Sequence, residues 1–280
     1  MLGLLWITSA CEPRLTQCTK KFSDGSLEYE VPCKRGIFHG EYREYNRAGD
    51  LWITKQFEDG VEVDTTRYYF SNTGEVLKAI PMQNGKRHGT ALEYLENGRL
   101  KRTQEYENGE RNGADILYYE TPSAPHTSRT YTHGELEGPY VHYTPGGDTV
   151  LLGSFVAGQR SGMWTYFYED GALKAEINFA QGNMEGNFRI YRPNGKPYVS
   201  GRAKAGKVTG PVSYYTSTGA VKFQKRWRNG TNMEHDMASR MEHHYQENKA
   251  GFWISGERHY IYMKPDTVQI GNRPLSTDEF

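Results

Sequence analysis

The sequence predicts an all-β fold, an elongated antiparallel meander of β-hairpins built from tandem repeats of 24–25 residues. Three observations predict it. A glycine recurs at this spacing through residues 36–230, an aromatic residue follows each of these glycines at a fixed distance, and turn dipeptides divide the chain into short runs. A fixed period of this length is typical of repeat architectures.

Eight repeats follow when the recurring glycine is taken as position zero. Position four is a second glycine in seven repeats and Asp64 in the second repeat. The fourth repeat replaces its central turn with the different loop 121–125. The repeats start at Gly36, Gly60, Gly85, Gly109, Gly134, Gly158, Gly182 and Gly206, and Gly230 closes the last one. Position nine is aromatic throughout, as Tyr45, Tyr69, Tyr94, Tyr118, Tyr143, Phe167, Tyr191 and Tyr215.

The runs between turns are too short for helices and suit strands. Dipeptides such as Asn108-Gly109, Asp170-Gly171 and Asn229-Gly230 tolerate positive φ and favour tight hairpins. The intervening residues are rich in Tyr, Phe, Thr, Val and Trp, which fit a pleated, half-buried surface. One hairpin alone is marginally stable in water, so we expect neighbouring repeats to stabilise one another.

Two sets of aromatic residues lie on opposite faces of such a sheet. The regular position-nine rings are expected to pack on one another as the core. Even-numbered positions face away from position nine because side chains alternate along a strand. The aromatic residues there are therefore expected to be exposed in part and to form the partner-binding surface; the alternative is that they only shield the backbone of a single-layer sheet. The candidates for binding are Tyr140, Trp164, Tyr166, Phe188 and Tyr214.

The composition argues against several functional classes. Lys plus Arg and Asp plus Glu both total 34, so no net field attracts nucleic acid or anionic lipid. No phosphate loop, nucleophile elbow or paired-carboxylate motif is present, and the segment 234–244 lacks the His spacing of a helical zinc site. We therefore expect no enzymatic activity, no cofactor, no metal and no nucleic-acid partner.

The N-terminus predicts export and lipid anchoring. Residues 1–10 are apolar, and Thr8-Ser9-Ala10-Cys11 resembles a bacterial lipobox in which the cysteine is acylated. The match departs at Thr8, where Leu is usual, and no charged segment precedes it. An upstream start codon is one explanation, and an ordinary soluble N-terminus is the alternative. Ten apolar residues are too few to span a bilayer, so contact with the membrane would be through the lipid alone.

Cys18 and Cys33 are the two remaining cysteines. If Cys11 is acylated, they form an even pair, and in an oxidising compartment a disulfide between them is expected. Two unrelated free thiols are the alternative. The pair gives further support for export.

The sequence thus divides into four segments: a signal-like segment 1–11, a tether and cap 12–35, eight repeats 36–230 and a C-terminal capping region 231–280. In the last segment, Phe252–Ile254 and His259–Met263 are expected to form a final hairpin. Terminal repeats are usually atypical because they end the stack.

The repeat resembles a known family. The pattern Gly158, Gly162, Trp164, Phe167 and Gly171 looks like the MORN-like repeats of YwqK-family proteins, and the segment 85–109 shows the same pattern. The resemblance implies an extended β-hairpin protein that is often exported or lipid-anchored, and the family label "antitoxin" accompanies it. Fold similarity alone does not establish function.

The sequence therefore predicts a non-catalytic scaffold that binds a protein partner at the bacterial cell envelope. Two alternatives remain open. One is an antitoxin-like protein that binds a toxin, and the other is an envelope protein whose exposed rings stack on glycans. Secretion or a cytoplasmic location would replace the envelope if Cys11 is not acylated.

Overall fold

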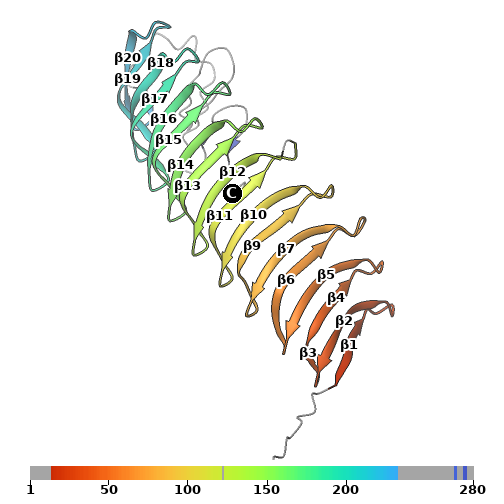
Figure 1. The fold of residues 1–280 in the computed structure, drawn as a ribbon. Coiled ribbons are helices and arrows are strands. Elements are labelled where there is room, and N and C mark those ends of the chain that lie inside the picture. Colours follow the sequence, from red (N-terminus) through yellow and green to blue (C-terminus); the bar gives the residue numbers. More distant parts are fainter. Residues whose placement is uncertain (1–13, 122, 233–267, 270–273, 276–280) are drawn as a thin grey trace, which may run out of the picture. The chain divides into compact units, whose positions relative to one another are not determined.

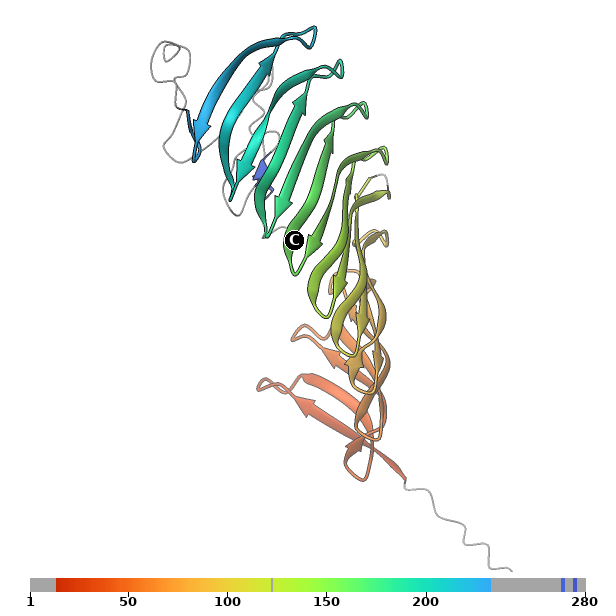
Figure 2. The same cartoon turned by 90° about the vertical axis from the view of Figure 1, so that its left-hand side faces the viewer.

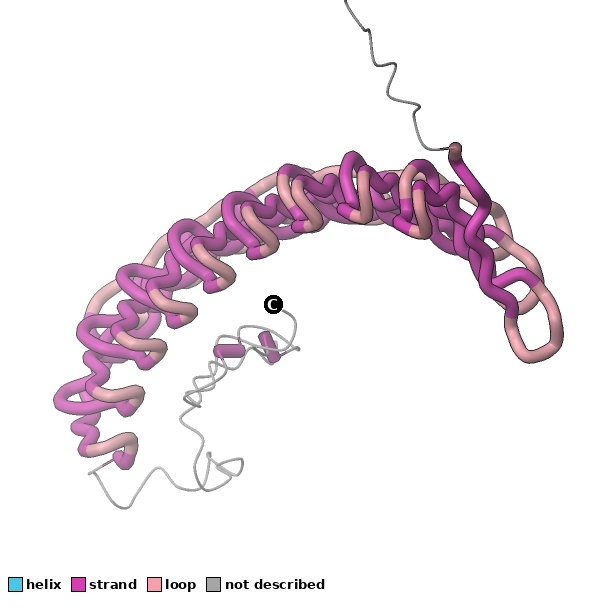
Figure 3. Tube along the Cα trace, turned by 90° about the horizontal axis from the view of Figure 1, so that it is seen from below, coloured by secondary structure: helices cyan, strands magenta, loops and turns pink. Residues whose placement is uncertain are grey.

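The computed structural model describes residues 14–121, 123–232, 268–269 and 274–275. These residues form strands and turns and no helix, so the predicted all-β class is confirmed (Figure 3). The chain divides into two compact units, residues 1–123 and 124–280, and the division falls within the irregular loop of the fourth repeat. The final hairpin expected within residues 252–263 and the lipobox at Cys11 lie outside the described residues.

The first unit is an antiparallel meander in which each hairpin follows the previous one in chain order (Figure 1). Two strands precede Gly36, so the expected cap is itself a hairpin. Its strands are β1 (Leu15–Lys21), β2 (Leu27–Lys34), β3 (Ile37–Phe38), β4 (Gly40–Tyr45), β5 (Leu51–Glu58), β6 (Val61–Tyr69), β7 (Val76–Gln83), β8 (Lys86–Arg87), β9 (Gly89–Tyr94), β10 (Leu100–Glu107) and β11 (Glu110–Tyr118).

The second unit has the same construction, and Figure 2 shows its hairpins side by side in green to blue. Its strands are β12 (Pro125–Thr132), β13 (Glu135–Tyr143), β14 (Thr149–Val156), β15 (Gln159–Phe167), β16 (Leu173–Ala180), β17 (Asn183–Tyr191), β18 (Pro197–Lys204), β19 (Lys207–Tyr215), β20 (Val221–Arg228) and β21 (Thr231–Asn232). A separate short pair consists of β22 (Val268–Gln269) and β23 (Pro274–Leu275).

Two kinds of turn alternate along the chain. At repeat boundaries both turn residues have positive φ, as in Asn229 (50°) and Gly230 (83°), which is the backbone of a tight hairpin turn. At the centre of a repeat only the glycine does. A side chain of the turn caps it: Asp170 Oδ1 accepts the N–H of Ala172 at 3.0 Å, and in the first repeat Asn46 Oδ1 accepts the N–H of Ala48 at 2.9 Å.

Position four bends the hairpins. All seven glycines there have φ between 71° and 117°, and Asp64 adopts 60°, a left-handed conformation that aspartate tolerates better than most residues. The ladder loses its register at this point. Leu152 of β14 pairs with Thr165 of β15, and Ser154 pairs with Ser161. Three residues of β15 therefore lie between these two pairs, opposite a single residue of β14. Such a bulge bends the strand and increases its twist.

One face of the sheet carries the core, and we call it the inner face. Position six is at most 9% exposed in every repeat. The residue before the closing turn, position 21, is also buried in most repeats, for example Phe155, Phe179 and Ala203. The position-six residues are Tyr42, Thr66, Ala91, Asp115, Tyr140, Trp164, Phe188 and Val212.

The prediction that position nine forms the core is wrong, because these rings are half-buried on the opposite face, which we call the outer face. Tyr191 donates its hydroxyl to Glu176 at 2.7 Å, and Glu176 alternates along β16 with the buried Ala175 and Ile177. Successive position-nine rings sit two strands, roughly 9–10 Å, apart, so they cannot stack on one another.

The hydroxyl groups explain why this column is regular. In four repeats the position-nine tyrosine hydroxyl forms a hydrogen bond with the residue fifteen positions earlier, on the neighbouring strand. The pairs are Tyr45 with Glu30 (2.9 Å), Tyr69 with Thr54 (3.0 Å), Tyr191 with Glu176 (2.7 Å) and Tyr215 with Ser200 (2.8 Å).

Candidate docking surface

Most of the predicted partner-binding residues lie in the core of the second unit. Tyr140, Trp164, Tyr166 and Phe188 are at most 4% exposed, so their expected exposure is wrong. Tyr214 is half-buried and stacks on Phe223 with ring centroids 4.7 Å apart. A glycan cannot stack on the buried Trp164 ring, so the geometry removes the basis of that alternative.

Trp164 is buried because the opposite strand makes room for it. The indole stacks on Tyr140 at 5.6 Å, meets Phe155 and Phe179 edge-on, and donates Nε1–H to the carbonyl of Ser154 at 3.3 Å. A Cβ on Gly153 would lie 2.3 Å from the indole. The ring therefore covers the backbone of a residue that has no side chain.

Phe188 and Tyr166 are held in the same core. A Cβ on Gly201 would lie 2.8 Å from the Phe188 ring, so this ring also covers a glycine. Burial raises the pKa of the Tyr166 phenol to about 12, which keeps it neutral. These side chains stabilise the sheet and are not available to a partner.

The outer face of the second unit carries an apolar patch that consists of Val141, Leu152, Met163 and Phe167. Phe167 replaces the usual tyrosine at position nine, and Leu152 stands fifteen residues earlier, where other repeats place the hydroxyl's partner. Val141 pairs with Leu152 across the ladder. Leu152 is 40% exposed and Met163 is 45% exposed. Two apolar side chains thus occupy the site of an interstrand hydrogen bond.

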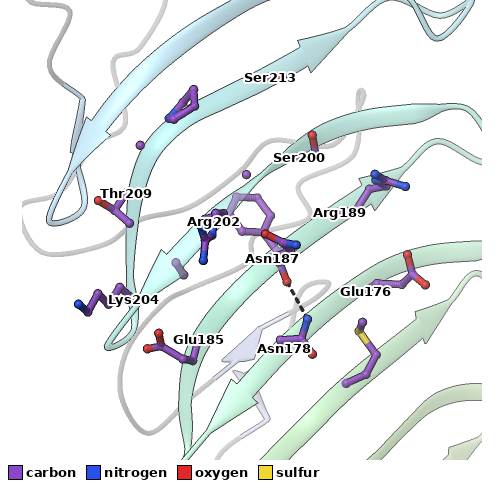
Figure 4. A pocket seen from close by; sticks show the side chains of 16 residues that line it. Glu176, Asn178, Glu185, Asn187, Arg189, Ser200, Arg202, Lys204, Thr209 and Ser213 are labelled. Atoms are coloured by element: carbon purple, nitrogen blue, oxygen red, sulfur yellow. Dashed lines mark hydrogen bonds between the residues drawn. The ribbon is translucent and has the colours of Figure 1, made fainter.

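A groove of about 670 Å³ lies beside this patch, across β15 to β19, and Met163 belongs to both (Figure 4). Its lining is mostly polar. Asn178 Nδ2 donates to the carbonyl of Asn187 at 3.2 Å, the bond drawn in Figure 4. Other labelled side chains are Glu176, Glu185, Arg189, Ser200, Arg202, Lys204, Thr209 and Ser213.

Both carboxylates of the groove already have structural partners. Glu176 accepts the Tyr191 hydroxyl, and Glu185 accepts the backbone N–H of Ala205 at 2.8 Å. The hydroxyl and amide groups around them can contact the main chain and side chains of another polypeptide.

Sequence reasoning missed this surface because it took regular aromatic recurrence as a sign of burial. Two signals were available. Tyr occupies seven of eight position-nine sites, and a dry core has no use for so many hydroxyl groups. The one exception, Phe167, coincides with an apolar residue at the partner position, Leu152.

Cys18 and Cys33 form a disulfide in the structure, with Cα atoms 5.8 Å apart. The bond joins the neighbouring strands β1 and β2 diagonally, because Cys18 is paired with Val31 in the ladder and Cys33 is paired with Thr16. Within the described ranges no group of three or more His, Cys, Asp or Glu side chains is placed to hold a metal ion. The same residues include no helix with the length and apolar character of a membrane span.

A histidine pair lies at the start of the second unit. The rings of His126 and His142 meet edge-on with centroids 4.5 Å apart, and Thr127 Oγ1 is 2.9 Å from Nδ1 of His126 and 3.2 Å from Nδ1 of His142. Burial, and secondarily the neighbouring His126, lowers the pKa of His142 to about 4. His142 is therefore neutral at pH 7.

Comparison with known proteins identifies the repeat. The family model for the MORN repeat variant matches residues 87–108 and 160–181. A MORN repeat variant is found at these two repeats. The finer resemblance to YwqK-family antitoxins stays a prediction. No curated protein shows a significant match to the sequence.

Two solved structures show a local likeness. They are titled "Crystal Structure of TcdB2-TccC3-Cdc42" and "Structure of Photorhabdus luminescens Tc holotoxin pore, Mutation TccC3-D651A", both at 12% identity. The matches cover 75% and 92% of this chain, with TM-scores of 0.20 and 0.19. The chain spans 14% of the length of each of these proteins. Because the TM-scores are this low, nothing about fold or function follows from the two matches.

Proposed function

We propose that this protein is a non-catalytic repeat scaffold that binds a protein partner on the outer face of its second unit. MORN repeats suggest such a scaffold. The observation that carries the proposal is the apolar patch of Val141, Leu152, Met163 and Phe167 beside the polar groove. Protein interfaces commonly combine a small apolar centre with a polar, solvated rim.

The chemistry of the groove supports binding over catalysis. Glu176 and Glu185 are each engaged in a hydrogen bond within the fold, so neither stands ready as a general acid or base. The antitoxin alternative is one form of the same proposal, in which the partner is a toxin.

The experiment uses the full chain as bait in envelope extract. The variant Leu152→Asp/Met163→Asp places charges in the apolar patch. Its matched control, Trp52→Asp/Val61→Asp, changes two exposed apolar side chains of the first unit, 49% and 44% exposed. We expect wild type and control to capture the same protein and the patch variant to lose it. Capture of nothing above background, or equal capture by both variants, would contradict the proposal.

We further propose that the scaffold works at the bacterial cell envelope, attached through acylated Cys11. The disulfide between Cys18 and Cys33 supports an oxidising compartment. Mass analysis of the mature N-terminus tests the anchor: a diacyl- or triacyl-modified Cys11 is expected. An unmodified N-terminus with reduced Cys18 and Cys33 would favour the cytoplasmic alternative.

A further inference from the structure

The charges of the second unit are strongly segregated along the chain. The whole sequence is neutral, yet residues 186–230 contain ten Lys and Arg and no Asp or Glu. Residues 124–185 contain seven Asp and Glu and only three Lys and Arg. We infer that the outer face of the last repeats binds an acidic segment of the partner polypeptide. This inference rests on the proposed function and names the chemistry of the partner.

Most of these cations lie on the outer face. Arg202 and Lys204 alternate along β18 with the buried Val199 and Ala203, and Lys207 adjoins the buried Val208 on β19. On β20 the buried Trp227 fixes the same alternation. The resulting basic stripe consists of Arg189, Arg202, Lys204, Lys207, Lys222, Arg226 and Arg228.

Salt bridges do not compensate the charge of this stripe, although Arg189 interacts with the Tyr191 hydroxyl and with Glu176. Across the described part of the chain, the salt bridges do not include any of its seven residues. Lys204 and Lys207 directly face each other in the ladder. Like charges at paired positions destabilise a sheet, and an anionic ligand relieves this repulsion.

The stripe continues into the groove and the apolar patch. Arg189, Arg202 and Lys204 line the groove (Figure 4), and Met163, which belongs to the patch, lines it too. If a partner packs an apolar side chain against Met163, its adjacent residues lie close to the guanidinium and ammonium groups of the groove. Complementary charge of this kind chiefly raises the association rate and selects the partner.

A polypeptide fits this surface better than a nucleic acid. Glu176 and Glu185 stand among the cations and would repel a phosphate backbone, which carries charge at every nucleotide, whereas a peptide can place a neutral residue there. Single-stranded nucleic acids also use aromatic stacking platforms. The one aromatic ring in the groove lining, Phe188, is only 3% exposed.

The test measures binding of a fluorescent peptide of about 12 residues in which Glu alternates with Ser, long enough to span about 40 Å when extended. The variant Arg202→Glu/Lys204→Glu/Lys207→Glu reverses three charges of the stripe. The matched control Arg67→Glu/Lys78→Glu/Lys86→Glu makes the same net change in the first unit. A Lys-Ser peptide and single-stranded DNA are the competing probes.

We expect the Glu-Ser peptide to bind wild type and the control equally, to weaken at least about tenfold in the stripe variant, and to weaken with added salt. Absence of binding, equal loss in both variants, or tighter binding of single-stranded DNA would overturn the inference. In the bait experiment, the stripe variant could still capture a partner whose binding depends on Leu152 and Met163. That result would also overturn the inference, but it would leave the scaffold proposal intact.

Discussion

The two units share a backbone but differ in what they bury at the same position. After Tyr42, position six holds the smaller or polar Thr66, Ala91 and Asp115 in the first unit, whereas the second unit has Tyr140, Trp164 and Phe188 before Val212. The second unit has one apolar cluster that includes sixteen buried residues, whereas the first has two clusters that include three each. The turns and bulges, which both units share, therefore determine the fold. The residues at position six on the inner face determine how each unit is stabilised.

Rings pack around Tyr42 at the start of the first unit, and a polar network takes their place around Asp115 near its end. Asp115 is 1% exposed and receives Nε and Nη2 of Arg102 at 2.7 and 2.6 Å. Gln104 Nε2 donates to the same carboxylate at 3.2 Å, and the Tyr106 hydroxyl donates to Gln104 at 2.6 Å. Such networks stabilise only when every member has a partner.

The largest expected effect is removal of the central ring of the second unit. Trp164→Ala should lower the free energy of unfolding by about 3–5 kcal/mol, because it leaves a cavity among Tyr140, Phe155 and Phe179. Urea denaturation measures it. Trp52→Ala removes an exposed indole in the first unit and should cost less than about 1 kcal/mol. Equal losses would refute the difference between the two positions.

In the first unit the vulnerable group is a charge. Asp115→Ala should lower the free energy of unfolding by about 2–4 kcal/mol, since Arg102 would keep a partly buried charge without its carboxylate. The double variant Arg102→Met/Asp115→Leu should recover much of this loss in the same urea experiment. A double variant less stable than Asp115→Ala would show that the pair itself stabilises the unit.

A methyl group tests the contact between ring and glycine. Gly153→Ala should destabilise the second unit by about 1–3 kcal/mol because the new Cβ meets the Trp164 indole. Gly146→Ala is the matched control: its φ is ordinary and the nearest atom is 3.5 Å away, so it should be neutral or slightly stabilising. Thermal unfolding compares the two, and the expectation fails if their midpoints coincide.

The smallest expected effect is sensitivity to acid. The unfolded chain protonates His142 near pH 6.5, whereas the folded pKa is about 4, so the unfolded state gains a proton first as the pH falls. The free energy of unfolding should decrease between about pH 7 and pH 4 by about 1–2 kcal/mol, a value reduced for partial solvation. His142→Gln should show a smaller decrease in urea melts at about pH 7 and 5. An unchanged decrease would assign the acid sensitivity elsewhere.

The period, strands and turns could be predicted because they depend on local chemistry. Glycine at the turns and at position four reports a backbone conformation that other residues adopt with strain. The choice of core face could not be made this way, because alternation says that Trp164 and Phe167 face apart but not which face is buried. Recurrence then misled: Tyr191 and Tyr215 recur to form hydrogen bonds on the outer face.

The charge pattern shows the same limit. A net charge of zero argued against nucleic acid and anionic lipid as partners, but it is a sum over the chain and does not show where charges gather. Residues 186–230 hold their ten cations without a single carboxylate, and the alternation of β18 to β20 directs most of them to one face.

The separation of the two faces has an evolutionary consequence. Inner side chains such as Trp164 and Val212 hold the hairpins together, while outer ones such as Leu152 and Arg202 contribute little to that packing. Mutations on the outer face can therefore change partner preference at small cost in stability. Duplication of one repeat would add two strands and roughly 10 Å of new surface with the inner packing preserved. This architecture allows recognition to diversify while the fold stays constant.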